Sequence, residues 1–215
     1  MKRSLLLSTA ALGIAMLPLG AAEAQGPSPF DNPGLYFGAF GGFFSGKVTI
    51  AEEKELIRGP IDGFIGGGLV GYTFQRPADR PVSLSIEADI GFGHLNGIGD
   101  ETADAVQQVY TYDLQWLGHF GLLAGVPMGN VMPFVRVGGA VAELGIEPLY
   151  PTGTVAGVSL GGGINAAFGP NFTGRAEVLY DIFCDKTIAY DSEEGTVGLS
   201  GFTFRLAAIF KLPPH

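Results

Sequence analysis

Residues 82–92 alternate strictly between apolar and polar or small side chains. The apolar members occupy every second position: Val82, Leu84, Ile86, Ala88, Ile90 and Phe92. The positions between them hold Ser83, Ser85, Glu87, Asp89 and Gly91. Because successive side chains of a β-strand point to opposite faces, the segment predicts a strand with one apolar and one polar face. Such strands build a sheet that separates two different environments.

The same period of two recurs along the chain. It is clear at 110–122 and at 156–168. In the second of these segments glycine takes most of the polar positions. Weaker forms cover 35–45, 64–74, 134–142, 173–183 and 197–212. Eight strands, an even number, can close on themselves without leaving an unpaired edge. We therefore predict an all-β fold, an eight-stranded antiparallel up-and-down transmembrane β-barrel.

The predicted connections alternate between short and long. Turns rich in proline, glycine, asparagine and aspartate occupy 75–81, 127–130 and 169–171. Longer loops are predicted at 47–62, 94–105, 143–153 and 185–196. Short turns on one rim and long loops on the other are typical of outer-membrane barrels, whose short turns face the periplasm. Both termini should then lie on the periplasmic rim.

The N-terminus has the pattern of a secretory signal peptide. Lys2 and Arg3 precede an apolar run of about 15 residues, too short for a membrane-spanning helix, and Ala22-Glu23-Ala24 is a cleavage motif. We predict a signal peptide at 1–24, a periplasmic segment at 25–33, the barrel at 34–212 and a short tail at 213–215. Export of this kind favours localisation in the bacterial outer membrane.

Composition narrows the possible partners. The chain has 35 glycines, 16 phenylalanines and only 15% charged residues, which is unusual for a soluble domain. The formal net charge of −9 argues against nucleic acid as a partner, because phosphate binding needs clustered lysine and arginine. Cys184 is the single cysteine of the sequence and can form no internal disulfide.

Alternation leaves two orientations open, lipid-facing apolar residues or a soluble lipocalin-like barrel with an apolar interior. Charges of both signs occupy the middle of glycine- and serine-rich polar faces, which suits a narrow lumen where charges must pair. We predict a lumenal charge network of Glu87, Asp89, Asp113, Arg136, Arg175, Glu177 and Arg205. Aromatic residues near strand ends suggest interfacial girdles: Tyr36, Phe37, Phe43, Phe44, Tyr72, Phe74, Tyr110, Tyr112, Phe168, Phe183 and Phe210.

Several segments resemble one family. They are Gly34-Leu-Tyr-Phe-Gly-Ala-Phe-Gly-Gly, Gly63-Phe-Ile-Gly-Gly-Gly-Leu-Val-Gly-Tyr, Pro133-Phe-Val-Arg-Val-Gly-Gly-Ala and Arg175-Ala-Glu. The chain resembles the small outer-membrane β-barrels that include opacity-type proteins and the membrane domain of OmpA. The resemblance implies surroundings of lipid and lipopolysaccharide and insertion by the barrel assembly machinery. Family chains usually end on an aromatic residue, whereas this one ends after Phe210 and Leu212 with Pro-Pro-His.

Catalytic and metal chemistry have weak support. Asp113, Gln115 and His119 share one strand face, but the six residue steps from Asp113 to His119 span about 20 Å, too far for a triad within one strand. We predict no catalytic residue, cofactor or metal. The acidic stretches 52–55, 100–104 and 185–194 read as solvated surface, with a specific cation site as the alternative.

The predicted function is a non-enzymatic outer-membrane protein with a structural or surface-interaction role through its extracellular loops. The alternatives are a lipid-modifying outer-membrane enzyme and a small low-conductance porin. The loops carry no motif that names an extracellular ligand.

Overall fold

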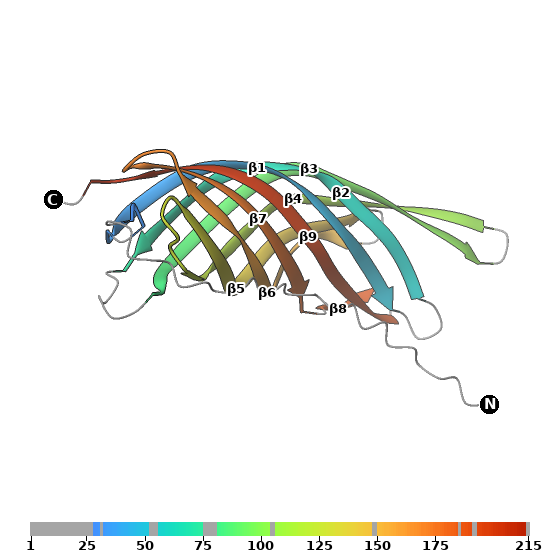
Figure 1. Ribbon diagram of the computed structural model, residues 1–215. Helices are drawn as coiled ribbons and strands as arrows, with labels where there is room; N and C mark the ends of the chain where they lie inside the picture. The colour runs from blue at the N-terminus through green and yellow to red at the C-terminus, as the bar shows by residue number, and fades with distance from the viewer. Residues whose placement is uncertain are drawn as a thin grey trace, which may run out of the picture.

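The computed structural model describes residues 28–30, 32–51, 56–74, 81–103, 106–147, 150–184, 186–190 and 193–213. These residues form nine strands (Figure 1): β1 Gly34–Ala51, β2 Leu56–Thr73, β3 Ser83–Ala103, β4 Val106–Gly125, β5 Val131–Glu147, β6 Tyr150–Ala167, β7 Phe172–Phe183, β8 Lys186–Tyr190 and β9 Glu193–Lys211. No helix in this part of the chain is long and apolar enough to cross a membrane. The predicted signal peptide, 1–24, lies outside the described residues.

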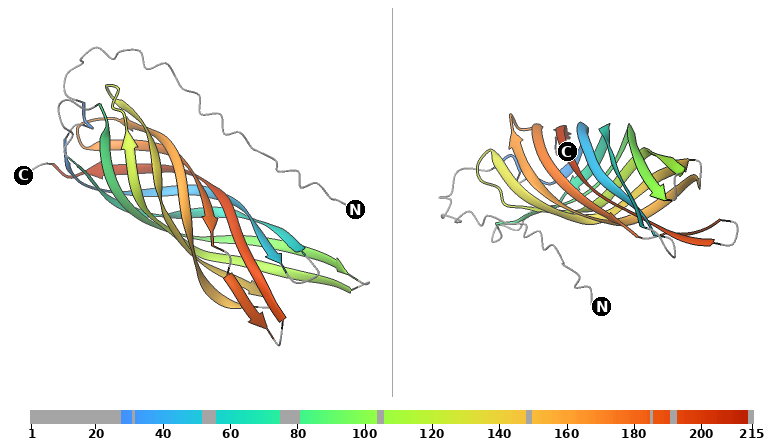
Figure 2. Two further views of the ribbon diagram at one scale, coloured as in Figure 1. Left: turned by 90° about the horizontal axis from the view of Figure 1, so that it is seen from below. Right: turned by 90° about the vertical axis from the view of Figure 1, so that its right-hand side faces the viewer.

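Eight of the strands close into an antiparallel barrel, as predicted. Each of β1 to β7 pairs with the next barrel strand, β7 pairs with β9, and β9 pairs back onto β1. The short β8 forms a hairpin with the outer part of β9. At the closing seam Phe37 lies opposite Phe210, and the Leu212 amide donates to the Leu35 carbonyl at 2.9 Å. The beginning and end of the barrel therefore meet at one rim (Figure 2).

The barrel wall presents its apolar residues outward. On β3, Leu84, Ile86, Ile90 and Phe92 are 43 to 59% exposed, whereas Ser85, Glu87 and Asp89 are buried in the lumen. Ile164 and Leu160 on β6 are also exposed, and Asn165 is buried. This arrangement excludes the soluble alternative, because a soluble barrel would bury these apolar faces.

The outward apolar residues form a continuous band. It runs over 9 to 11 residues of a strand, for example 202–210 on β9 and 172–182 on β7. At the usual strand tilt this length gives a band about 25 Å tall, the height of the hydrocarbon layer that such barrels cross. We call these outward residues the lipid-facing band.

Beyond the lipid-facing band, toward the hairpin ends, the polarity of the outward and inward faces of the strands is reversed. Outward positions become polar and exposed, as at Ser45, Lys47 and Asp62. Inward positions become apolar and buried, forming what we call the upper core: Phe44, Val48, Ile61, Ile65, Leu95, Leu114, Leu117, Ala140, Ala142, Leu144, Val155, Phe183 and Leu199. This part of the barrel is built like a soluble one, because water surrounds it instead of lipid.

The alternation at 110–122 puts Leu114 on the same apolar face as Phe120 and Leu122 and so predicts that all three face lipid, which is wrong for Leu114. Phe120 and Leu122 are exposed, but Leu114 is fully buried in the upper core. The pairing of β4 with β5 shifts register between Leu114 and Trp116. A β-bulge of this kind adds one residue to a strand and reverses the faces on either side of it.

The predicted long loops are largely strand. The described strands continue to Ala51 and Leu56, to Ala103 and Val106, and to Glu147 and Tyr150, so each hairpin turns over only a few residues. The predicted loop 185–196 contains β8. Backbone pairing continues past the membrane boundary because the upper core supports it, although the polar and acidic residues there obscure the alternation.

The short turns and the residues before β1 close the opposite rim. Gly129, with a φ of 64°, occupies the turn between β4 and β5, where glycine adopts a backbone conformation that strains other residues. The Ser28 hydroxyl donates to the Gly129 carbonyl at 2.8 Å. Phe30 is buried with Met132 and Ala167. The segment before β1 thus packs under this mouth of the barrel.

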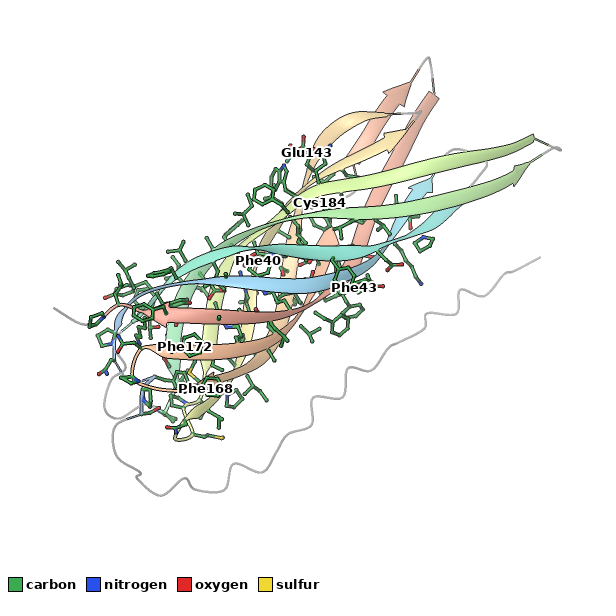
Figure 3. The ribbon with its side chains drawn as sticks, turned by 90° about the horizontal axis from the view of Figure 1, so that it is seen from above. Phe40, Phe43, Glu143, Phe168, Phe172 and Cys184 are labelled. Carbon is green, nitrogen blue, oxygen red and sulfur yellow. The ribbon has the colours of Figure 1, made fainter. Side chains whose placement is uncertain are left out.

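Aromatic residues mark the rim of the short turns. Phe168 and Phe172 lie together at this rim (Figure 3). Their ring centroids are 6.1 Å apart, and those of Phe37 and Phe210 are 5.8 Å apart. Toward the other boundary, the Trp116 indole donates to the Glu143 carboxylate at 2.6 Å. Three residues predicted for girdles lie inside the barrel instead: Tyr36, Phe44 and Phe183. Their strand positions fall on the lumenal face.

Candidate functional site

A cluster of charged side chains fills the lumen at the level of the lipid-facing band. Six of the seven residues predicted for a lumenal network meet there, from β3, β5, β7 and β9: Glu87, Asp89, Arg136, Arg175, Glu177 and Arg205. Strand register places them together, since Glu177 on β7 lies directly opposite Arg205 on β9. Side chains of these six residues are at most 3% exposed.

Glu87 is the centre of one half of the cluster. Its carboxylate accepts hydrogen bonds from Nη1 of Arg136 at 2.9 Å, Nη1 of Arg175 at 2.8 Å and the Tyr36 hydroxyl at 2.8 Å. Nε of Arg175 also donates to the Asn165 side chain at 2.9 Å. Charge-assisted bonds of this kind are short and strong, so they fix the orientation of both arginine planes.

Asp89 is the centre of the other half. It accepts from Nη2 of Arg136 at 2.8 Å and from Nη2 of Arg205 at 3.1 Å. Arg205 also donates through Nε to Glu177 at 2.8 Å. Arg136 therefore bridges Glu87 and Asp89, and Arg205 bridges Asp89 and Glu177, which joins the two halves into one network.

Aromatic rings cover two of the guanidinium groups. The Arg175 guanidinium lies 5.0 Å from the centroid of the Phe134 ring, and that of Arg205 lies 4.8 Å from Phe40. A cation over an aromatic face gains electrostatic attraction while it remains sheltered from water. The arginines are thus held by carboxylates on one side and by rings on the other.

Two members were missing from the predicted network. His119 contacts Asp89 through Nδ1 at 2.8 Å and Asp181 through Nε2 at 3.2 Å. A neutral imidazole has one N–H, so both ring nitrogens can donate only when the ring carries a second proton. The protonated ring would balance the cluster, whose three arginines face four carboxylates. Asp181 could have been found, since it shares the inward face of β7 with Arg175 and Glu177.

Asp113, the seventh predicted residue, is not placed in the cluster. It lies on β4 beyond the bulge, opposite Asn96 and Gly145, and its side chain is outside the described part of the structure. His94 likewise lies in β3 with an undescribed side chain, and His215 lies outside the described residues.

The geometry does not suit catalysis at His119. Both ring nitrogens contact carboxylates, whereas a catalytic triad needs one of them to accept the proton of a nucleophile. The ring is also buried in the lumen, away from the rim where a lipid substrate could approach. Among the described residues, no group of three or more histidine, cysteine, aspartate and glutamate side chains is arranged to hold a metal ion.

The sequence of residues 9–210 matches the family described as outer membrane protein beta-barrel domain. The chain belongs to this family. The curated 31 kDa outer-membrane immunogenic proteins of Brucella melitensis and Brucella suis are each 26% identical over 197 residues, 80% of this chain and 80% of theirs. The predicted resemblance to small outer-membrane barrels is confirmed, and so is the predicted localisation in the outer membrane.

Solved outer-membrane barrels share the fold. The structure of OprG from Pseudomonas aeruginosa superimposes with a TM-score of 0.59, at 12% sequence identity, over 87% of this chain and 100% of that one. At this level of identity the similarity shows the fold of this outer membrane protein beta-barrel domain and does not show its function.

Proposed function

We propose that this outer-membrane barrel is a non-enzymatic scaffold with a closed lumen, which presents its extracellular hairpins to the surroundings of the cell. The observation that carries the proposal is the filling of the lumen in two layers. The charge cluster fills the level of the membrane, and the upper core fills the level above it. In neither layer do the described side chains line a water-filled channel through the barrel.

The upper core supports a presenting role. The β3–β4 hairpin continues for 11 residues past Phe92, the last strongly exposed apolar residue of β3 in the band, before it ends at Ala103. At the base of the hairpin Leu95 and Leu114 are buried in the upper core, which holds this end together without help from lipid. The hairpin tips are therefore carried on a rigid base, a common arrangement for interaction surfaces.

Conductance distinguishes this proposal from a small porin. In planar bilayers the purified barrel is expected to give no salt-dependent current steps, because eight strands leave room only for side chains. A larger porin inserted in the same bilayer is the positive control. Reproducible steps from the wild-type barrel would contradict a closed lumen.

A mass spectrum of lipid A distinguishes the proposal from a lipid-modifying enzyme. Cells that overproduce the barrel are expected to contain lipid A of unchanged mass, since neither ring nitrogen of His119 is available to a nucleophile. A mass shift that appears only with the barrel would contradict the non-enzymatic role.

Epitope tags test which rim faces outward. A tag inserted at 104–105, between β3 and β4, is expected to bind antibody on intact cells. A tag beside Gly129 in the β4–β5 turn is the matched control and should bind antibody only after permeabilisation. The reverse pattern would contradict the proposed presentation. The Brucella relatives are named immunogenic outer-membrane proteins, which fits hairpins that antibodies can reach.

Assembly is the second part of the proposal. Phe210 is outward facing near the end of β9 and contacts Phe37 on β1, so it is the aromatic residue best placed to serve as the terminal signal for the barrel assembly machinery. Phe210→Ala should lower the folded fraction in the outer membrane of intact cells, while refolding of the purified chain into detergent changes less. Equal loss in both measurements would indicate a packing role alone.

A further inference from the structure

A groove of about 960 Å³ lies on the lipid-facing wall, across β6, β7, β9, β1 and β2. One row of register partners crosses it from strand to strand: Ile164, Ala176, Leu206, Gly41 and Gly66. The adjoining row is formed by Val178, Phe204, Phe43 and Phe64. The small residues of the first row form the floor, and the larger residues of both rows form the walls.

The fold does not require glycine at two positions of the floor. A Cβ atom at Gly41 would meet no atom within 4 Å, and at Gly66 the nearest atom would be the Phe40 carbonyl oxygen at 3.5 Å. By contrast, a Cβ at Gly42 would lie 2.4 Å from the Phe204 carbonyl oxygen. Glycine weakens a strand, and inside a strand it often marks a bulge, a bend, or the close approach of a ligand or another backbone.

The groove follows the path of an acyl chain in the outer leaflet. On β1 and β2 it occupies the extracellular end of the lipid-facing band, at residues 41–43 and 64–66. On β6 and β7 it reaches the middle of the band, at 162–164 and 176–178. At its outer end the rings of Phe43 and Phe64 pack edge to face, 5.3 Å apart, and Phe43 lies on the face of β1 opposite to the buried Phe40 (Figure 3).

The lining selects an apolar occupant. Glu177 and Arg205 contribute to the groove wall, but both residues are 3% exposed and their charged groups pair with each other in the lumen. A second copy of the chain fits poorly, because a two-fold contact would set one groove against another and leave a void. A flexible hydrocarbon chain can fill the hollow.

We propose that this groove binds an acyl chain of lipid A, the membrane anchor of lipopolysaccharide in the outer leaflet. Lys47 supports this source. It is exposed on β1, two outward positions beyond Phe43 and past the lipid-facing band, at the level where an anionic headgroup would attract a basic side chain. Asp62 is also exposed, on the neighbouring strand β2, so this part of the surface carries both a positive and a negative side chain.

Filling the groove tests the proposal. The double variant Gly41→Leu/Gly66→Leu adds side chains where Cβ atoms have room, so the barrel should still fold. Ala88→Leu places a leucine on the outward face of β3, outside the groove, and is the control for an added apolar side chain on the lipid-facing band. Each protein is folded in detergent, incubated with purified lipopolysaccharide and analysed by native mass spectrometry. Wild type and Ala88→Leu should retain lipopolysaccharide, and the double variant should retain about tenfold less.

The other outcomes overturn the proposal. Equal retention by the groove-filled and control variants would remove the groove as the site. Retention of phosphatidylethanolamine as strong as that of lipopolysaccharide would remove lipid A as the occupant. A dimer that disappears on filling the groove would assign it to a second copy. Should the double variant fail to fold, Phe64→Ala removes the exposed wall instead and should also weaken retention. The hairpin tags do not depend on this result.

Discussion

At the scale of single residues, the stability of the lumen depends on pairing every buried charge. Arg175 donates to both oxygens of Glu87 and to Asn165. Arg175→Ala should lower the free energy of unfolding in detergent by about 3 to 5 kcal/mol, because it leaves a buried carboxylate short of a partner. Thermal unfolding followed by circular dichroism measures the change. An unchanged transition would contradict the network.

Arg175→Lys separates charge from geometry. Lysine keeps the positive charge but not the planar fork that reaches Glu87 and Asn165 together. The unfolding transition of this variant should lie between those of wild type and Arg175→Ala. A lysine variant as stable as wild type would show that charge alone matters at this position.

Gly71 on β2 has a steric role in seating the Tyr36 side chain. The Tyr36 side chain crosses Gly71 to reach Glu87, and a Cβ atom at Gly71 would lie 2.3 Å from the ring. Gly71→Ala should therefore destabilise the barrel by about 1 to 3 kcal/mol. Gly68→Ala is the control, since the nearest atom to its Cβ would be 3.6 Å away. Equal effects in chemical unfolding would contradict the steric role.

At the scale of the strands, β4 shows how alternation places two leucines, both on the same side of the bulge, in different surroundings. Leu117 is fully buried in the upper core, and Leu122 is 58% exposed in the lipid-facing band. Leu117→Ala should cost about 2 to 5 kcal/mol in detergent-solubilised protein, because it leaves a cavity. Leu122→Ala should cost much less, since detergent or lipid fills the space. Urea unfolding of both variants tests the difference, and equal losses would contradict the assignment.

At the scale of the whole molecule, closure distributes stability unevenly. Every barrel strand has two neighbours, whereas β8 is a five-residue strand at the end of the sheet order beside β9. Amides of β8 should exchange with deuterium at least about tenfold faster than those of β7, because an isolated hairpin is marginally stable. Hydrogen exchange with mass spectrometry in micelles measures this. Similar protection in β7 and β8 would show that the hairpin is part of the cooperative barrel.

The charge cluster could be predicted only in part from the sequence. Alternation put Glu87, Arg175 and Arg205 on polar faces, and an even number of strands implied that those faces meet in one lumen. Alternation also put Asp181 on the inward face of its strand, but it could not show that Asp181 and Asp89 both contact His119, because contacts across the lumen depend on the register of strands far apart in the chain. It also could not show that Tyr36 turns inward to Glu87.

The sequence by itself determined the architecture, since a period of two in eight segments leaves a closed barrel as the way to separate lipid from a polar lumen. Only the tertiary structure decided where the faces change roles. The bulge beside Leu114, the upper core above the membrane and the groove at Gly41 and Gly66 arise from pairing across strands. The physical reason is that a local pattern fixes the two faces of a strand, whereas register and surroundings fix what each face meets.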